Sequence, residues 1–422
     1  MSIIKPFQAL RPKEGMGQVV SSKSWDSHHN HLSRLVMENN EFSYLHVVKP
    51  HLNFSDGERI PEKHFPYAKT KLDELKELGV LIKDEKPCFY LYLVHDLVKK
   101  IDYYGIVGIA SIDDYLNGSI KKHENTISRK EDALVEHINY VRTIGEPVLL
   151  TFEAGLWYDA LIEKVQTKQA LYDFTGDEGV QTVVWMIDEP DEINAIEQAF
   201  LQLQSLYIAD GHHRSAGAAK FCLSQRAKNL NYDGSEAFNY FLAYFIPTNR
   251  LKVFEFNRLV KDLNGLTEDE FLDKLREKFS VTLIGSAALK VKKKQARFGL
   301  YLNKKWYGLD LLPNWKLPGD VLSRLDVSIL ENEILKPILN IQDSKTDERI
   351  AFVDGTKGIH RLQEMVDIGE FKAAFSLYPT KVEEVIAVAD ANGIMPPKST
   401  WFEPKLRTGL LAYEVRELSS EQ

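Results

Sequence analysis

The stretch TVVWMIDEPDEINAIEQAFLQLQSLYIADGHHRS, residues 182–215, decides the fold class. Residues 182–187 form an apolar, β-branched run that is typical of a buried strand. Residues 191–203 carry apolar side chains at helical spacing, and a third apolar run follows at 206–209. A strand, a helix and a strand in succession predict a core of mixed α/β type.

The sequence before this stretch continues the same alternation. Short apolar and aromatic runs at 87–97, 105–112 and 147–152 predict further strands. Apolar residues at helical spacing predict helices over 66–83, which closes on a glycine, and over 127–144. We therefore expect a fold of mixed α/β and α+β class, in which helices pack on a mixed sheet.

The pattern changes after residue 250. A charged helix is predicted over 267–279, a hairpin around Asn303, and another helix over 321–333. These elements predict two domains: a ligand-binding α/β core over residues 1–250, and a C-terminal α+β part over residues 251–422 whose last segment returns to the pocket of the first.

Composition narrows the class of protein. The chain has 422 residues, and 53 Lys and Arg against 61 Asp and Glu give a net charge of −8, which argues against nucleic acid as a partner. The two cysteines, Cys88 and Cys222, cannot form a four-thiolate metal site and suit a reducing cytoplasm. Residues 1–11 lack the apolar run of a signal peptide, and no 18 apolar residues run together, so we expect a cytoplasmic protein without a membrane segment.

The first group of candidate site residues follows the apolar run 206–209. Gly211 permits a tight turn, the N–H groups of the next helical turn can bind an anion, and Arg214 can bind phosphate oxygens in a bidentate manner. Asp210, His212 and His213 add carboxylate and imidazole groups suited to proton transfer. The alternative is an ordinary helix start, in which Asp210 caps the helix and the histidines lie on the surface.

The second group lies in IKKHENTISRKED, residues 120–132. His123 and Glu124 can supply a general base, and Glu124, like Asp210, can bind Mg²⁺. The alternative is a polar loop that leads into a helix capped by Thr126 or by the serine two residues later.

The third group lies in MPPKSTWFEPKLRTG, residues 395–409, a stiff segment that is too basic for a core. We expect it to dock and to provide Lys398 and Lys405 to a phosphate-binding pocket. It can equally be a segment that only packs on the surface. Arg258, which follows a strand-like run at 253–256, can bind a phosphate or be a surface arginine.

Five segments together resemble a known family. They occur in the order in which the family has them: KPFQALRP, IKKHENTISRKED, IADGHHRS, FNRLV and MPPKSTWFEPKLRTGL. Taken together they resemble the bacterial and archaeal family called domain of unknown function 1015, and the resemblance runs nearly from end to end. Members are often described as chromosome-partitioning or ParB-like proteins.

The resemblance implies a role for the turn at residues 210–214. It is similar to the turn of the ParB and sulfiredoxin superfamily, where the equivalent segment holds nucleotide phosphates and, in free-serine kinases, serves phosphoryl transfer to a small hydroxyl compound. A phosphate-binding or catalytic role is thus implied for Asp210, Gly211, His212, His213 and Arg214. This sequence has Ser215 where the family more commonly has tyrosine, and it has no helix-turn-helix segment that would imply DNA binding.

These observations predict a nucleotide-dependent phosphoryl-transfer enzyme that acts on a small hydroxyl metabolite, in the manner of a small-molecule kinase. ATP or ADP is the expected nucleotide, with CTP as an alternative, together with Mg²⁺. Arg214, Gly211, His212, Arg258, Lys398 and Lys405 would hold the nucleotide, and Asp210, His213, Glu124 and His123 would carry out the catalysis. One alternative is a ParB-like regulatory protein that binds nucleotide without turnover, and another is a metal-dependent hydrolase. The expected partners are the substrate and the nucleotide, with a homodimer left open.

Overall fold

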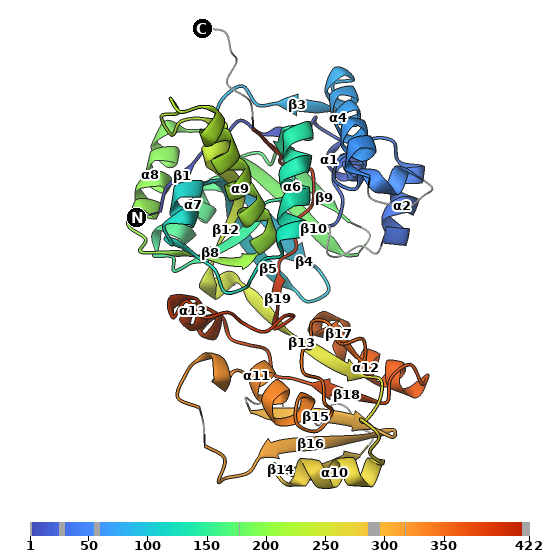
Figure 1. Cartoon of the computed structure of the whole chain (residues 1–422). Coiled ribbons are helices and arrows are strands. Elements are labelled where there is room, and N and C mark those ends of the chain that lie inside the picture. Colours follow the sequence, from blue (N-terminus) through green and yellow to red (C-terminus); the bar gives the residue numbers. More distant parts are fainter. Residues whose placement is uncertain are drawn as a thin grey trace. The chain divides into compact units, whose positions relative to one another are not determined.

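The computed structural model describes residues 2–24, 30–54, 60–176, 178–285, 296–316 and 318–415. The chain divides into two compact units (Figure 1). Unit 1 consists of Met1–Leu251 together with Pro404–Gln422, and unit 2 consists of Lys252–Glu403. Unit 2 is therefore an insertion into the sequence of unit 1.

Unit 1 is built on a nine-stranded mixed sheet, counted among the described residues. Its strand order is β6-β11-β8-β12-β5-β4-β10-β9, and β1 pairs with β5. The pairs β6 with β11 and β8 with β12 are parallel, and the other pairs are antiparallel. The strands are β1 (Ile4–Lys5), β4 (Phe89–Asp96), β5 (Ile101–Ser111), β6 (Ile120–Lys121), β8 (Val148–Phe152), β9 (Tyr172–Thr175), β10 (Val180–Ile187), β11 (Leu206–Asp210) and β12 (Tyr240–Pro247). This mixed sheet confirms the predicted α/β class.

Two helices of unit 1 lie side by side and position the candidate residues (Figure 1). These are α6 (Ser128–Val141) and α9 (His212–Lys228). A Cβ on Gly217 of α9 would come within 2.9 Å of the Cβ of Leu134 on α6, so the glycine permits the close packing of the two helices. The first turn of α9 is thereby brought next to the loop that precedes α6. The remaining helices of unit 1 are α1 (Gly17–Val20), α2 (Asn30–Asn39), α3 (Leu45–Val48), α4 (Pro61–Glu77), α5 (Ile112–Leu116), α7 (Trp157–Val165) and α8 (Pro190–Leu201).

The glycine on which the helix predicted over 66–83 closes is confirmed as its stop, but the predicted range starts too late and extends past this stop. Helix α4 begins five residues earlier and ends at Glu77, because Gly79 adopts a left-handed conformation with φ +62° that stops the helix. The apolar residues that follow form β3 (Leu81–Lys83), which pairs with β2 (Leu10–Pro12). A periodic pattern alone does not separate the last helical turn from a short strand behind it.

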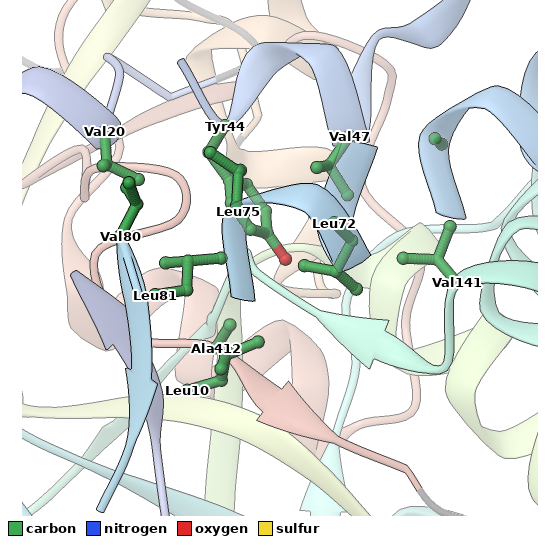
Figure 2. Close-up of a cluster of buried hydrophobic side chains, with 11 residues drawn as sticks. Leu10, Val20, Tyr44, Val47, Leu72, Leu75, Val80, Leu81, Val141 and Ala412 are labelled. Atoms are coloured by element: carbon green, nitrogen blue, oxygen red, sulfur yellow. The ribbon is translucent and has the colours of Figure 1, made fainter. Parts of the chain in front are cut away.

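The C-terminal residues of unit 1 belong to one of its hydrophobic clusters (Figure 2). Ala412 is buried in this cluster with Tyr44 and with Leu75 of α4. Leu10 and Ala412 exchange two backbone hydrogen bonds of 2.9 Å, and directly after Ala412 β20 (Tyr413–Glu414) pairs with β7 (Thr143–Ile144). The last described residues are therefore fixed to unit 1 by both backbone pairing and apolar burial.

Unit 2 contains a seven-stranded antiparallel sheet among its described residues. Its order is β14-β16-β15-β18-β13-β17, and β19 pairs with β13. The strands are β13 (Lys252–Val260), β14 (Phe279–Gly285), β15 (Arg297–Leu302), β16 (Lys305–Leu311), β17 (Ile350–Asp354), β18 (Ala373–Ser376) and β19 (Thr400–Glu403). The helices are α10 (Glu268–Arg276), α11 (Asp326–Leu330), α12 (Gly358–Asp367) and α13 (Val382–Asp390).

Two sequence predictions can be compared with unit 2. The hairpin around Asn303 is confirmed: β15 and β16 pair, and Asn303 has φ +48° in the turn. The single helix predicted over 321–333 is wrong, because Leu325 adopts an extended conformation and separates a 3₁₀ turn (Leu322–Arg324) from α11. A π-helical turn, Glu331–Leu335, then follows α11.

Among the described residues, no helix combines the length and the apolar character that crossing a bilayer requires.

Gly409 tests how tightly the C-terminal segment is fixed. The residue has φ +77°, and a Cβ there would come within 2.2 Å of the ring of Tyr44. We expect Gly409→Ala to lower the free energy of unfolding by about 2 to 4 kcal/mol, since it adds steric overlap to the strain of a left-handed alanine. Urea unfolding of the full chain measures the loss.

The matched control for this substitution is Gly15→Ala. Gly15 has the same φ of +77°, but nothing lies within 4 Å of a Cβ added there. It should cost only the conformational strain, about 1 to 2 kcal/mol. Equal losses at the two positions would mean that Gly409 is not in close contact with Tyr44.

Candidate functional site

The turn between β11 and α9 is built by two local features. The pairing of β11 with β8 shifts register between Ile208 and Asp210, which marks a bulge at the end of the strand. Gly211 then adopts φ +99°, and α9 begins at His212 without a side-chain cap. The helix therefore starts with first-turn N–H groups that no capping side chain covers. The alternative in which Asp210 caps α9 is wrong, because the N-cap residue is Gly211.

Asp210 is held by two cations. Its Oδ2 atom accepts from Nζ of Lys405 at 3.1 Å and from a guanidinium N–H of Arg214 at 3.2 Å. Burial alone would raise the pKa of Asp210, but Lys405 and Arg214 outweigh it and hold this pKa well below its usual range. Asp210 is thus an ionised carboxylate and a poor proton acceptor at neutral pH.

Arg214 is placed by Gly211 as well as by Asp210. Its guanidinium also donates to the carbonyl of Pro147, which precedes β8. A Cβ on Gly211 would come within 3.1 Å of the guanidinium carbon, so the glycine leaves room for the arginine over the turn. The side chain is only partly exposed, with 23% of its surface accessible.

A polar pocket surrounds this group and lies entirely within unit 1. Its lining combines an N-terminal serine with residues of the turn, of β8 and the segment before it, and of the C-terminal segment: Ser24, Glu146, Pro147, Leu149, Asp210, Arg214, Pro404, Lys405, Leu406, Arg407 and Thr408. Lys405 therefore lies beside the Asp210–Arg214 turn, as the docked C-terminal segment was expected to allow.

The C-terminal segment is held at the pocket by contacts of the residues that follow Lys405. Thr408 and Ser22 exchange backbone hydrogen bonds of 2.8 and 3.1 Å. Arg407 donates to the hydroxyl and the carbonyl of Ser21, at 2.8 and 2.7 Å, and lies over the ring of Phe174. The segment that carries Lys405 is thus fixed near Asp210 by backbone and side-chain contacts with Ser21 and Ser22.

His123, Glu124 and His212 form a second group beside the turn. One ligand-type atom from each of them lies within 4.8 Å of the others. Nδ1 of His212 is 3.5 Å from Oε2 of Glu124, and the rings of His123 and His212 meet edge to face at 4.5 Å between centroids. The two candidate groups that lie far apart in the sequence are therefore adjacent in unit 1.

The hydrogen bonds of the histidines define their tautomers. Nε2 of His212 accepts the backbone N–H of His123 at 3.4 Å, so the proton of the neutral imidazole is on Nδ1, which faces Glu124. Nε2 of His213 accepts the backbone N–H of Ile127 at 3.2 Å, at the start of α6. His213 thus contacts the residue before α6 and is not part of the group of His123, Glu124 and His212.

Burial keeps the two inner histidines neutral. It lowers the pKa of His123 to about 4, an effect that Asp210 and the backbone of Ile208 only partly offset. Burial also lowers the pKa of His212 well below its usual value, and the neighbouring His123 adds to this. Both imidazoles are therefore uncharged at neutral pH.

A metal ion suits these residues poorly in their observed arrangement. A metal bound to Nδ1 of His212 would move its proton to Nε2, where the N–H of His123 already points. Mg²⁺ at Asp210 would have to compete with Lys405 and Arg214 for the same carboxylate oxygen. The structure thus gives no support to Mg²⁺ at Asp210, and Glu124 remains the better placed carboxylate.

Two predicted phosphate-binding residues lie in unit 2. Arg258 on β13 is 3% exposed, donates to the carbonyl of Phe256 at 2.5 Å, and lies over the ring of Phe352. Burial lowers its pKa to about 10, partly offset by Glu331. Lys398 lies over the ring of Phe256. These contacts are all internal to unit 2.

Four polar residues of the pocket lining were not predicted from the sequence: Ser24, Glu146, Arg407 and Thr408. Arg407 and Thr408 lie in the same C-terminal segment as Lys405. Glu146, which accepts from the hydroxyl of Thr408 at 2.7 Å, stands between a glycine and a proline directly before a buried strand. A charged residue next to the end of a buried strand is also the feature that identified Asp210, although Glu146 precedes its strand and Asp210 ends its own.

The fold and the site together define a mixed α/β protein with a polar pocket at a strand, turn and helix junction. Residues 4–328 match the family described as "Protein of unknown function (DUF1015)", and the chain belongs to this family. The sequence prediction of the family is thereby confirmed. No curated protein sequence matches the chain significantly.

Several solved structures show weak likeness to the chain. A free serine kinase in complex with AMP is 16% identical, with a TM-score of 0.34 over 72% of this chain and 91% of its own. A conserved hypothetical protein from Pyrococcus furiosus is 15% identical, with a TM-score of 0.33 over 72% and 94%. SbnI with a C-terminal truncation from Staphylococcus aureus is 10% identical, with a TM-score of 0.36 over 72% and 85%.

The burial of His123 in its neutral form predicts how the stability of the protein depends on pH. The unfolded chain takes up a proton on His123 near pH 6.5, but the folded chain does so only near pH 4. The stability from this histidine is therefore complete above pH 6.5 and is lost as the pH falls toward 4, at up to about 1.4 kcal/mol per pH unit.

Urea unfolding at pH 6.5 and pH 4.5 checks this for the full chain and for His123→Phe, which keeps a ring but does not titrate. The fall in unfolding free energy should be shallower in the variant. His360→Asn, which removes an exposed histidine of unit 2, is the control. If the unfolding free energy falls between pH 6.5 and pH 4.5 by the same amount in His123→Phe as in the unsubstituted chain, His123 is not buried in its neutral form.

Proposed function

We propose that unit 1 binds a nucleotide through its phosphates at the Asp210–Arg214 turn and transfers a phosphoryl group to or from the hydroxyl of a small metabolite. The observation that carries the proposal is the convergence of Arg214 and Lys405 on one side of the first turn of α9. Cations beside the N-terminus of a helix that no side chain caps are the elements with which proteins hold phosphate.

The charge of the pocket supports an anionic ligand. Arg214, Lys405 and Arg407 bring three positive charges, and Asp210 and Glu146 bring two negative ones, so the lining carries 3 − 2 = +1. The chain as a whole carries −8, so the charge of the pocket lining is opposite in sign to that of the chain. Such a local field favours a phosphate group over a neutral ligand.

Glu124 is the best candidate for the proton acceptor. Asp210 is a weak base because two cations stabilise its ionised form, and the acceptor nitrogen of His213 already receives the N–H of Ile127. Glu124 is 35% exposed at the side chain and lies beside the turn through its contact with His212. A substrate hydroxyl can therefore reach it from solvent.

The chemistry assigns one task to each group. Arg214 and Lys405 would bind phosphoryl oxygens and stabilise the negative charge that develops during transfer. Glu124 would accept the proton of the attacking hydroxyl. ATP or ADP is the proposed nucleotide, with CTP as the alternative. The similarity of the turn to that of the ParB and sulfiredoxin superfamily supports the same assignment.

Substitution of Arg214 tests the phosphate contact. We expect Arg214→Ala to weaken nucleotide binding by about 10-fold to 100-fold, since a charge-assisted contact is worth about 1.5 to 3 kcal/mol. Calorimetric titration of the full chain with ATP, ADP and CTP, with and without Mg²⁺, measures the affinity. Lys405→Met should act in the same direction.

Arg226→Ala is the matched control, because Arg226 lies on the same helix and pairs with Asp113, outside the pocket lining. It should leave the affinity unchanged. Full affinity in a folded Arg214→Ala protein would remove the turn from the nucleotide site. Tight binding without phosphoryl transfer to any hydroxyl acceptor would favour the regulatory alternative over an enzyme.

A further inference from the structure

Glu124 meets His212 across a gap of 88 residues in the sequence, and the contact is oriented. The hydrogen bond from the backbone of His123 occupies Nε2 of His212, so the N–H of this imidazole is on Nδ1. Nδ1 lies 3.5 Å from Oε2 of Glu124. His212 is therefore in position to donate to the Glu124 carboxylate.

The ring of His212 is fixed from a second side. The ring of His123 meets it at an angle of 83°, with 4.5 Å between the centroids, and His123 is completely buried. His212 itself is 4% exposed and belongs to the first turn of α9. Backbone, ring and helix thus hold the donor at one angle to Glu124.

The charge state of His212 decides what the donor does to Glu124. Burial and the neighbouring His123, His213 and Arg214 disfavour the imidazolium form. A neutral donor orients the carboxylate without neutralising it. His212 therefore presents a neutral N–H, and not a positive charge, to Oε2 of Glu124.

We propose that His212 is a positioning residue that holds the carboxylate of Glu124 as the proton acceptor of the reaction. This inference rests on the proposed function. In the step, the hydroxyl oxygen of the substrate bonds to the γ-phosphorus of ATP, and the bond from that phosphorus to the ADP oxygen breaks. The hydroxyl proton passes to the carboxylate of Glu124 and from there to solvent, so the products are the phosphate ester, ADP and a proton.

Two substitutions separate the positioning role from a structural one. Asparagine at 212 places an amide N–H near the Nδ1 position, whereas glutamine places it near Nε2. We expect His212→Gln to lower kcat by about 10-fold to 100-fold with little change in the KM for ATP, because the phosphate contacts remain. His212→Asn should recover most of kcat.

The dependence of kcat on pH distinguishes a positioning role from a structural one, because a partial loss of folded protein lowers kcat without shifting its pH dependence. Loss of the donor destabilises the charged form of Glu124 and raises its pKa. The acid limb of kcat should therefore shift to higher pH in His212→Gln and return in His212→Asn. His95→Asn removes an imidazole that pairs with Asp102 on the β4–β5 hairpin, and it should leave the profile unchanged. Equal losses of kcat in both His212 variants, without a shift of the acid limb, would overturn the role.

NMR of the full chain with ¹⁵N-labelled histidine tests the contact independently of activity. At pH 7, His212 should be neutral with its proton on Nδ1, and Glu124→Gln should move this signal. A proton on Nε2, or an imidazolium, would overturn the contact. So would Zn²⁺ binding that is lost in both His212→Asn and Glu124→Gln. The expected tautomer without any phosphoryl transfer would refute the proposed function and the role, but would leave the contact in place.

Discussion

One oxygen of Asp210 holds together parts of the chain that are far apart in sequence. Arg214 reaches it from the next helical turn, and Lys405 reaches it from 195 residues further on. A half-buried carboxylate is unfavourable unless cations compensate it, and here the compensation comes from two directions. This carboxylate thus connects the end of β11, the first turn of α9 and the C-terminal segment.

Charged and neutral groups are separated within a few residues of the turn. Asp210 is ionised between two cations, while His123 and His212 next to it stay uncharged because they are buried. The same low-dielectric surroundings strengthen the first arrangement and forbid a charge on the second. A strand bulge and a glycine suffice to direct adjacent side chains into these two environments.

The sequence predicts the sheet well where strands are apolar and bounded by turn residues. The runs at 182–187 and 206–209 fall within β10 and β11, and the turn at Gly211 is where the residue types required it. The tight helix pairing at Gly217 and the ends of α4 are not readable from a single segment, because they depend on partners elsewhere.

For the site, local sequence identifies groups but not their partners. His123, Glu124 and the turn are visible as polar residues beside apolar runs, and Lys405 as a lysine in a stiff segment. Which nitrogen of His212 carries the proton depends on the backbone of His123, 89 residues away, and no sequence pattern encodes that. The role of Arg407 likewise depends on its contact with Ser21.

The insertion of unit 2 has a consequence for how the chain can be rebuilt. Lys252 and Glu403 are direct partners in the antiparallel pair of β13 and β19, so the chain leaves and re-enters unit 1 at neighbouring points. Unit 2 therefore resembles a long loop whose two ends are held together by strand pairing. The entropy lost on bringing the ends of a loop together grows only slowly with the length of the loop. A short linker from Leu251 to Pro404 would span the same gap, which makes unit 2 a module that can be excised or exchanged while every residue of the polar pocket stays on one continuous scaffold.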